Sequence, residues 1–289
     1  MVAVTEDLPL PSRRFSLLTA IRRNPTVTFG AVLLLALVAV AVVGPSFVSD
    51  PMKIAPVNRL RPPSERWWFG TDQFGRDVFA RTVWGSRVSL IVGLSVAAFS
   101  SIVGLALGLA CGYFRRFDGI VMRVMDGLMA IPSILLAIAL ITLTRPGLGI
   151  VIVAIVIPEV PRIVRVVRAV VLSIRAQPYI ESAIAGGTKN AKLLLRHVLP
   201  NTLAPLIVQS TYVCASAMLI EAGLSFLGAG VPPEVPSWGN IIAQGRTFFQ
   251  IAPWTILIPG AFLAVTVLAV NLLGDGLRDR LDPRLARRL

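Results

Sequence analysis

Long apolar runs alternate with short polar segments along most of this chain. Six such runs cover approximately residues 28–48, 88–113, 119–143, 147–168, 203–229 and 254–274. A hydrocarbon core about 30 Å thick needs about 20 mostly apolar residues per helix, and lipid offers no hydrogen-bond partner to an unpaired backbone group. The pattern therefore predicts an all-α membrane protein with six transmembrane helices. An even number of crossings places both termini on the same side.

The composition agrees with a membrane protein and argues against a nucleic-acid binder. Hydrophobic residues make up 55% of the chain and charged residues only 15%, and the mean hydropathy is +0.76. The net charge of +13 comes from basic residues between the apolar runs, and not from an aromatic-interleaved basic surface. The positive-inside rule accounts for this distribution.

The same rule predicts which side the termini occupy. If both are cytoplasmic, only nine of the 28 basic residues fall outside the cytoplasm. The cytoplasmic set is then Arg13, Arg14, Arg22, Arg23, Arg115, Arg116, Arg123, Arg162, Arg165, Arg168, Arg175, Lys189, Lys192, Arg196, Arg278, Arg280, Arg284, Arg287 and Arg288.

The segment from Lys53 to Arg87 partly breaks the rule, although neighbouring acidic residues offset its positive charge. Its aromatic residues suit a segment that lies along the outer interface of the membrane. These residues are Trp67, Trp68, Phe69 and Trp84.

A short polar segment between the fourth and fifth runs has the signals of a separate helix. Pro178 suits a first helical position, Glu181 places a carboxylate in the first turn, and Gly186 with Gly187 supplies a stop. A second helix is predicted to begin near residue 188 or 190 and to end before Pro200, because the residue before a proline avoids the helical region.

Small residues dominate the first of these two helices and allow close approach to another protein's backbone. They are Ser182, Ala183, Ala185, Gly186 and Gly187. The residues alone leave open whether the segment is a docking helix or an ordinary surface hairpin.

The order Glu181-Ser182-Ala183, then Gly187, then His197-Val198-Leu199-Pro200-Asn201 resembles the EAA loop of binding-protein-dependent ABC importer permeases. In that family the loop is a coupling helix that sits in a groove of the ATP-binding subunit. The resemblance implies an ATPase-coupling role for Glu181, Ser182, Ala183, Gly186, Gly187, His197, Leu199 and Pro200. Ser182 stands where the family more often has alanine, and Gly186 where a larger apolar residue is usual.

Four further stretches look like the C-type permease of dipeptide, oligopeptide and nickel importers. They are Phe69 to Val78, Glu221 to Gly228, Pro236 to Gly239 and Asn271 to Asp279. The resemblance implies the type I ABC importer permease fold in a bacterial plasma membrane. It also implies a B-type permease as heterodimer partner, two ATP-binding subunits and an extracytoplasmic substrate-binding protein.

Short peptides are the substrate that this resemblance favours, while nickel or another small solute stays open. A secondary transporter is the alternative from a different class, but the chain lacks the internal repeat that such proteins often show. The chain also lacks a G-x-x-x-x-G-K-[ST] phosphate loop, so ATP hydrolysis is expected in separate subunits. The predicted organisation is an N-terminal part, residues 1–83, and a five-helix permease domain, residues 84–289, with the coupling loop at 177–200.

Charged residues inside the predicted spans are candidates for the translocation path or for pairing within the membrane. Arg123 with Asp126, and Glu159 with Arg162, are each three residues apart, and pairing within one helix is the simpler interpretation for both. Lining of the substrate path is the alternative for Glu159, because Pro158 and Pro161 flank it and proline-freed carbonyls tolerate exposure only to protein or water. Glu221, near the outer end of its span, could anchor the helix or belong to an outer gate.

Catalysis and metal binding have little support in the sequence. Cys111 and Cys214 lie in separate apolar runs, and the lone histidine, His197, has no potential ligand or catalytic partner nearby. We therefore expect no enzyme activity, no metal and no cofactor in this subunit.

Overall fold

The computed structural model describes residues 25–144 and 147–281, and within these residues the regular secondary structure is helical. The main helices are α2 (Pro25–Val43), α3 (Val78–Tyr113), α4 (Arg115–Ala130), α5 (Ser133–Thr142), α6 (Leu148–Arg175), α7 (Pro178–Ala185), α8 (Asn190–Leu193), α9 (Leu199–Phe226), α10 (Trp238–Gly245) and α11 (Trp254–Leu281). Shorter helical turns are η1 (Gly44–Ser46), η2 (Pro56–Asn58), η3 (Leu194–Val198) and η4 (Arg246–Phe248). The predicted all-α class is confirmed.

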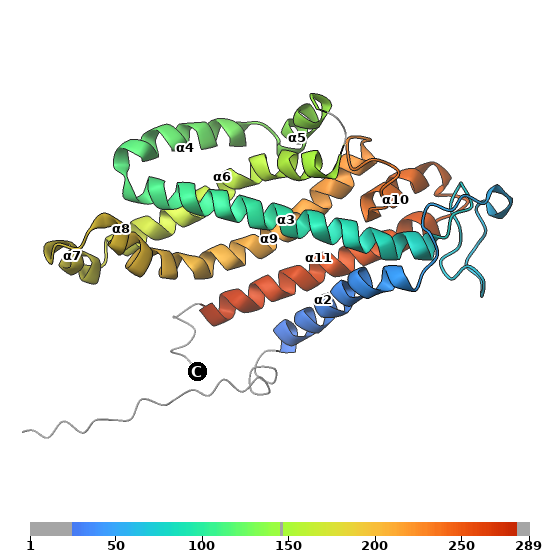
Figure 1. The fold of residues 1–289 in the computed structure, drawn as a ribbon, viewed down its shortest axis with the longest axis horizontal. Coiled ribbons are helices and arrows are strands. Elements are labelled where there is room, and N and C mark those ends of the chain that lie inside the picture. Colours follow the sequence, from blue (N-terminus) through green and yellow to red (C-terminus); the bar gives the residue numbers. More distant parts are fainter. Residues whose placement is uncertain (1–24, 145–146, 282–289) are drawn as a thin grey trace, which may run out of the picture.

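The long helices α2, α3, α6, α9 and α11 run side by side along the longest axis of the molecule (Figure 1). Helix α3 packs on α6 and α9, and α11 packs on α9 and α2. The α7–α8 hairpin lies at one end of the bundle, while α10 and the segment before α3 lie at the opposite end. The start of α2 and the end of α11 point toward the α7–α8 end. The terminal residues themselves, which we expect in the cytoplasm, lie outside the described ranges.

Four helical segments in the described ranges are long and apolar enough to cross a membrane, or five if the bent α4–α5 pair counts as one span. The predicted total of six is therefore not confirmed. The predicted span that is missing from this count, residues 147–168, coincides with α6, which has 28 residues but contains Glu159 and four arginines. It runs unbroken through Pro158 and Pro161.

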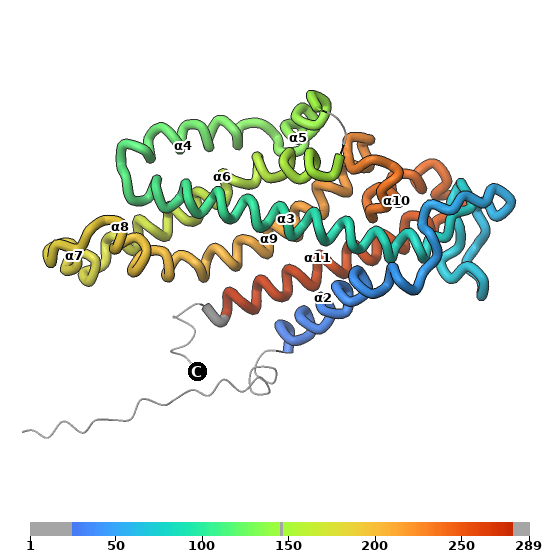
Figure 2. Tube along the Cα trace, in the orientation of Figure 1, coloured from blue at the N-terminus to red at the C-terminus, as the bar shows by residue number. Residues whose placement is uncertain are grey.

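The third predicted span, residues 119–143, is not one straight helix. It divides into α4 and α5, which are bent by 89° relative to each other, as the tube in Figure 2 shows. Pro132 lacks the N–H that would continue α4, and it holds the preceding Ile131 in an extended conformation, φ −92° and ψ 129°.

Helix α3 begins ten residues before the predicted start at residue 88, because Asp77 caps it. The Asp77 side chain accepts a hydrogen bond from the backbone N–H of Phe79 at 2.9 Å. Burial raises the pKa of the Asp77 carboxyl, and the N–H groups of Phe79 and Ala80 oppose that shift. The proposed division after residue 83 falls within α3, and the division itself stays a prediction.

The second helix of the hairpin does not end before Pro200, contrary to the prediction. Helix α8 passes through the π-turn η3 into α9, and Pro200 is the second residue of α9. A proline is tolerated there because the first backbone N–H groups of a helix need no intrahelical acceptor.

Glycine allows α3 and α6 to approach closely. Gly104, Gly108 and Gly112 recur every fourth residue on the side of α3 that faces α6. A Cβ atom added to Gly108 would lie 2.6 Å from the Cβ of Val167, which is well inside van der Waals contact. This packing holds α6, with its charged residues, against the centre of the bundle.

Candidate functional site

The hairpin at one end of the bundle contains the predicted short helix with its predicted ends. Pro178 is the first residue of α7, Glu181 lies in its first turn, and Gly187 has a positive φ of 76°. The N–H of Gly187 donates to Ile184 O at 2.9 Å, and the N–H of Thr188 donates to Ala183 O at 3.1 Å. This pair of bonds is the Schellman motif, which explains why a glycine ends the helix.

One residue anchors α7, and most of its surface stays open. Ile180 is fully buried in the main core. Glu181, Ser182, Gly186 and Gly187 are exposed, Ala183 is half-buried, and the apolar Ile184 is 52% exposed. Tyr179 of the same helix is 47% exposed, so α7 presents more than one exposed apolar side chain, as surfaces that contact another protein often do.

The downstream residues of the predicted coupling loop lie on the same hairpin. The ring of His197 lies 6.4 Å from the ring of Tyr179, which connects the end of the hairpin to α7. His197 and Leu199 are half-buried, and Pro200 is exposed. The structure therefore brings the predicted loop residues together at one end of the molecule.

A polar joint, not predicted from the sequence, ties this hairpin to the long helices. The hydroxyl of Tyr113, the last residue of α3, donates to Asn190 Oδ1 of α8 at 2.6 Å. Arg175, the last residue of α6, donates from Nη1 to the carbonyl oxygens of Gly112 and Tyr113 at 3.0 and 2.8 Å. Its guanidinium also lies over the Tyr113 ring, 5.0 Å from the centroid.

The predicted pair Glu159–Arg162 is present on α6. Arg162 Nη1 donates to both carboxylate oxygens of Glu159, at 3.0 and 3.3 Å. The Glu159 side chain is fully buried, whereas the Arg162 side chain is 45% exposed. One member of this pair therefore faces the core and the other an open surface.

The predicted pairing of Arg123 with Asp126 within one helix is wrong. Asp126 of α4 instead accepts from Arg165 Nη2 of α6 at 2.6 Å. Asp118 of α4 likewise pairs with Arg168 of α6, at 2.5 Å. Because α4 lies alongside α6 (Figure 1), a guanidinium of the neighbouring helix reaches these carboxylates.

Glu221 lies apart from these charges, toward the α10 end of the bundle, and is fully buried. Its Oε1 accepts from the hydroxyls of Ser225 and Ser237 at 2.9 and 2.8 Å. Its Oε2 has no hydrogen-bond partner among the described residues. Burial in protein excludes a role as an anchor at the lipid interface. A role in an outer gate stays a prediction.

A buried ionic centre organises the stretch from Phe69 to Val78. Asp72 Oδ2 accepts from Arg76 Nε and Arg81 Nη1, both at 2.7 Å. Asp72 Oδ1 accepts from the backbone N–H groups of Phe74 and Arg76 at 2.8 and 2.9 Å. Gln244 Oε1 of α10 accepts from both arginines, at 2.6 and 3.1 Å. The centre therefore joins the segment before α3 to α10.

Two other stretches singled out in the sequence meet at the same end. Trp238, the first residue of α10, is fully buried, and its Nε1 donates to the carbonyl of Thr82 in α3 at 3.0 Å. A Cβ atom at Gly239 would lie 2.6 Å from Cα of Ala222 in α9. These contacts require the small and aromatic residues of the Glu221–Gly228 and Pro236–Gly239 stretches.

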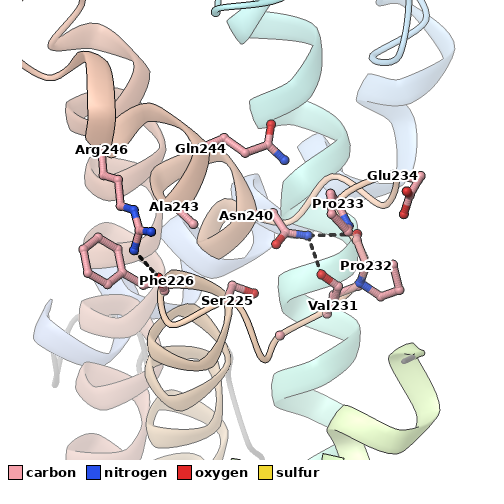
Figure 3. A pocket seen from close by; sticks show the side chains of 12 residues that line it. Ser225, Phe226, Val231, Pro232, Pro233, Glu234, Asn240, Ala243, Gln244 and Arg246 are labelled. Atoms are coloured by element: carbon pink, nitrogen blue, oxygen red, sulfur yellow. Dashed lines mark hydrogen bonds between the residues drawn. The ribbon is translucent and has the colours of Figure 1, made fainter. Parts of the chain in front are cut away.

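A pocket of about 480 Å³ opens beside this cluster, between the end of α9, the following loop and α10 (Figure 3). Asn240 Nδ2 holds the loop by donating to the carbonyls of residues 231, 232 and 235. Arg246 lies at one side of the pocket, where its Nη1 donates to Phe226 O at 2.9 Å. Glu234 lies at the other side, so the rim has one charge of each sign.

Metal-ligating side chains do not gather in the described ranges. No group of three or more His, Cys, Asp or Glu side chains there could hold a metal ion. Cys111 and Cys214 are both buried and free.

Comparisons with known proteins all identify permease components of transport systems. Residues 102–287 match the family model described as the binding-protein-dependent transport system inner membrane component. A probable peptide ABC transporter permease protein, y4tQ of Sinorhizobium fredii, is 56% identical over 99% of this chain and 100% of its own length. The dipeptide transport system permease protein DppC of Alkalihalophilus pseudofirmus is 42% identical over 92% of this chain and 88% of its own.

A more distant relative and a solved structure extend the comparison. The oligopeptide transport system permease protein OppC of Bacillus subtilis is 35% identical over 92% of this chain and 88% of its own. A chain of the MetNI methionine ABC transporter, in an inward-facing conformation, matches with a TM-score of 0.57 and 20% identity, over 76% of this chain and 100% of its own. This last likeness concerns the fold alone.

Proposed function

The chain belongs to the family of binding-protein-dependent transport system inner membrane components, and from this premise we propose that it carries short peptides across the bacterial plasma membrane as a permease subunit of an ATP-driven ABC importer. The relatives support the choice of substrate, since permeases named for peptides, dipeptides and oligopeptides match over nearly the whole chain. Because the chain belongs to this family of binding-protein-dependent transport components, the alternative that it is a secondary transporter is dropped. Such a permease works with ATP-binding and substrate-binding partners and is not itself an enzyme.

The α7 hairpin is proposed to be the coupling element that docks on an ATP-binding subunit. The open face of α7, with small residues around an exposed Ile184, supports this role. The joint of Tyr113, Asn190 and Arg175 supports it as well, because it connects the hairpin to both α3 and α6. A displacement of α7 would therefore reach two of the long helices.

The second permease subunit is proposed to be a B-type chain, and the translocation path to run along the charged face of α4 and α6. Arg162 and Arg165 are each 45% exposed there, and Asp126 is 58% exposed. Charged side chains in the middle of a membrane cost several kcal/mol unless they meet protein or water. A translocation path between two permease subunits would surround these side chains with both protein and water.

The proposed topology places the hairpin in the cytoplasm and the α10 end outside. Single cysteines at positions 190 and 234 test it, because both native side chains are exposed. Position 238 is unsuitable because Trp238 is fully buried. We expect a membrane-impermeant thiol reagent to label position 234 in intact cells and position 190 only after permeabilisation. The reverse pattern would invert the topology.

The experiment that tests the proposed function uses the complete importer in proteoliposomes, with Gly187→Asp as the central variant. Gly187 has φ +76° and open space around it, so a side chain there strains the backbone without disturbing the bundle. A negative charge also opposes the dipole at the end of α7. We expect peptide uptake and co-purification of the ATP-binding subunits to fall at least about tenfold, with normal amounts of protein in the membrane.

Two further variants calibrate this result. Gly186 has an ordinary φ of −74°, and its added Cβ would lie 3.4 Å from Ser182 O, so Gly186→Ala adds only a small side chain to the coupling loop without backbone strain and should reduce uptake far less than Gly187→Asp. Glu181→Lys reverses a charge in the first turn of α7 and should reduce uptake by only about two- to fivefold. Full uptake and normal co-purification in Gly187→Asp would show that the hairpin is not the docking element.

A further inference from the structure

Two arginines near the middle of α6 have side chains that are about half exposed. Arg162 is the fifteenth of 28 residues, which places it about 21 Å along a helix that rises about 1.5 Å per residue. Arg165 follows less than one turn later on the same face. Each side chain is 45% exposed, although each also has a carboxylate partner.

The contacts of these arginines leave donors free for a ligand. Arg162 uses Nη1 for Glu159, and Arg165 uses Nη2 for Asp126, among the contacts of the described residues. A guanidinium has five N–H donors in a rigid planar fork. Each arginine therefore keeps donors that can form a bidentate pair with a carboxylate.

A transported peptide needs such a partner at this depth. The carboxylate of an acidic side chain loses hydration inside the membrane region, and an uncompensated charge there costs several kcal/mol. A nearby guanidinium reduces that cost. Because both arginines already have anionic partners, the site can release the substrate without leaving an unpaired cation behind.

We propose that Arg162 and Arg165 form a carboxylate-binding site in the translocation path, which takes the side-chain carboxylate of a passing acidic peptide. This inference rests on the proposed function as a peptide permease. It adds that selectivity by charge arises within this chain after the binding protein has delivered its ligand.

The test compares three dipeptides of net charge −1, 0 and +1, each presented on saturated binding protein to the complete importer in proteoliposomes. Loading of the binding protein is measured separately, so that its own preference does not enter. Arg165→Gln is the main variant, because Asp126 is 58% exposed and tolerates the loss of its partner. Arg162→Lys keeps the positive charge at the second position but removes the planar fork.

We expect Arg165→Gln to reduce uptake of the anionic dipeptide about tenfold relative to the cationic one, the loss expected for one charged hydrogen-bonded contact. Arg162→Lys should also reduce uptake of the anionic dipeptide relative to the cationic one, but by a smaller factor. Arg168→Gln is the matched control, because Arg168 pairs with Asp118 on the same two helices but is only 31% exposed. It should change the uptake of all three dipeptides equally.

Three outcomes would overturn the proposal. One is an equal loss for all three dipeptides in Arg165→Gln, and another is a charge-dependent loss in Arg168→Gln. The third is failure of Arg165→Gln to assemble with its partner subunits, which would make Arg165 a contact between permeases. Peptide uptake by the importer without substitutions is measured separately, so that failure of the proposed function can be distinguished from failure of the proposed site. If the unchanged importer transports no peptide, the proposed function itself fails.

Discussion

Replacing Asp72 by asparagine should release the segment before α3 from the rest of the protein. Asp72 is 2% exposed and is the shared anionic partner of Arg76 and Arg81, whose side chains are 5% and 0% exposed. All four hydrogen bonds of its side chain use the two carboxylate oxygens as acceptors. An asparagine keeps one acceptor and turns the other position into a donor. In either orientation of the amide, two N–H donors therefore face a donor.

The cost follows from burial. Removing one partner of a buried ion pair costs about 3–5 kcal/mol, because the remaining charge stays buried without compensation. Here two guanidinium groups remain, and Arg81 Nε and Nη2 already have no hydrogen-bond partner among the described residues. We use the lower value, about 3 kcal/mol, since Gln244 still accepts from both arginines. That energy raises the open population of the segment about 100-fold.

Limited trypsin digestion of the purified protein measures this opening. Arg59 and Arg66 lie on exposed turns of the segment. The backbone N–H of Leu60 donates to Asp72 O at 3.0 Å, so movement of Asp72 loosens the chain around these sites. Cleavage there should accelerate strongly in Asp72→Asn, while the long helices stay resistant.

Asp50→Asn provides a control with the same chemical change. Asp50 is exposed, and its carboxylate accepts a bond from the N–H of Met52 at 2.8 Å. Its replacement should leave the cleavage rate within about twofold of the unchanged protein, as expected for an exposed site. If Asp72→Asn were cleaved no faster than Asp50→Asn, the buried centre would not be what holds the segment in place.

Two further predictions concern the interior of the bundle, and thermal unfolding of the purified protein checks both. Arg162→Ala leaves the fully buried Glu159 unpaired and should cost about 2–3 kcal/mol, less than for a fully buried pair because Arg162 is 45% exposed. The double variant Glu159→Gln/Arg162→Ala should be more stable than Arg162→Ala, and a less stable double variant would contradict the pairing argument. Gly108→Ala places a Cβ 2.6 Å from that of Val167 and should cost about 1–3 kcal/mol, whereas Gly127→Ala meets nothing within 4 Å and should be neutral or slightly stabilising. Equal stability of the two alanine variants would show that α3 and α6 can separate at no cost.

Local signals in the sequence were sufficient where a structure depends on neighbouring residues. The short helix α7 begins and ends as predicted, because Pro178 sets its first turn and Gly187 supplies the positive φ that ends it. The bend between α4 and α5 also has a local cause, Pro132. The prediction missed it because apolar residues flank Pro132 on both sides, so the pattern predicts one span over residues 119–143.

Contacts between distant segments could not be predicted in the same way. Spacing suggested that Asp126 pairs with Arg123, but the approach of α6 decides that its partner is Arg165, 39 positions away. The Phe69–Val78 stretch was recognised only as a resemblance. Its ionic centre depends on Gln244, which is 168 positions from Arg76. Arg76 and Asp72 are four residues apart, so that pair alone had a visible signal.

Helix α6 connects the two proposed sites within one rigid element. It contains Arg162 and Arg165 near its middle, and its last residue, Arg175, holds the end of α3 immediately before α7 begins. Because α6 continues unbroken through its two prolines, a displacement of α7 by an ATP-binding subunit would move the arginines without passing through a flexible loop. The ion pairs to α4 would move with them or exchange partners, since Asp126 and Arg165 are both about half exposed. We therefore expect docking at α7 to change the access of substrate to Arg162 and Arg165.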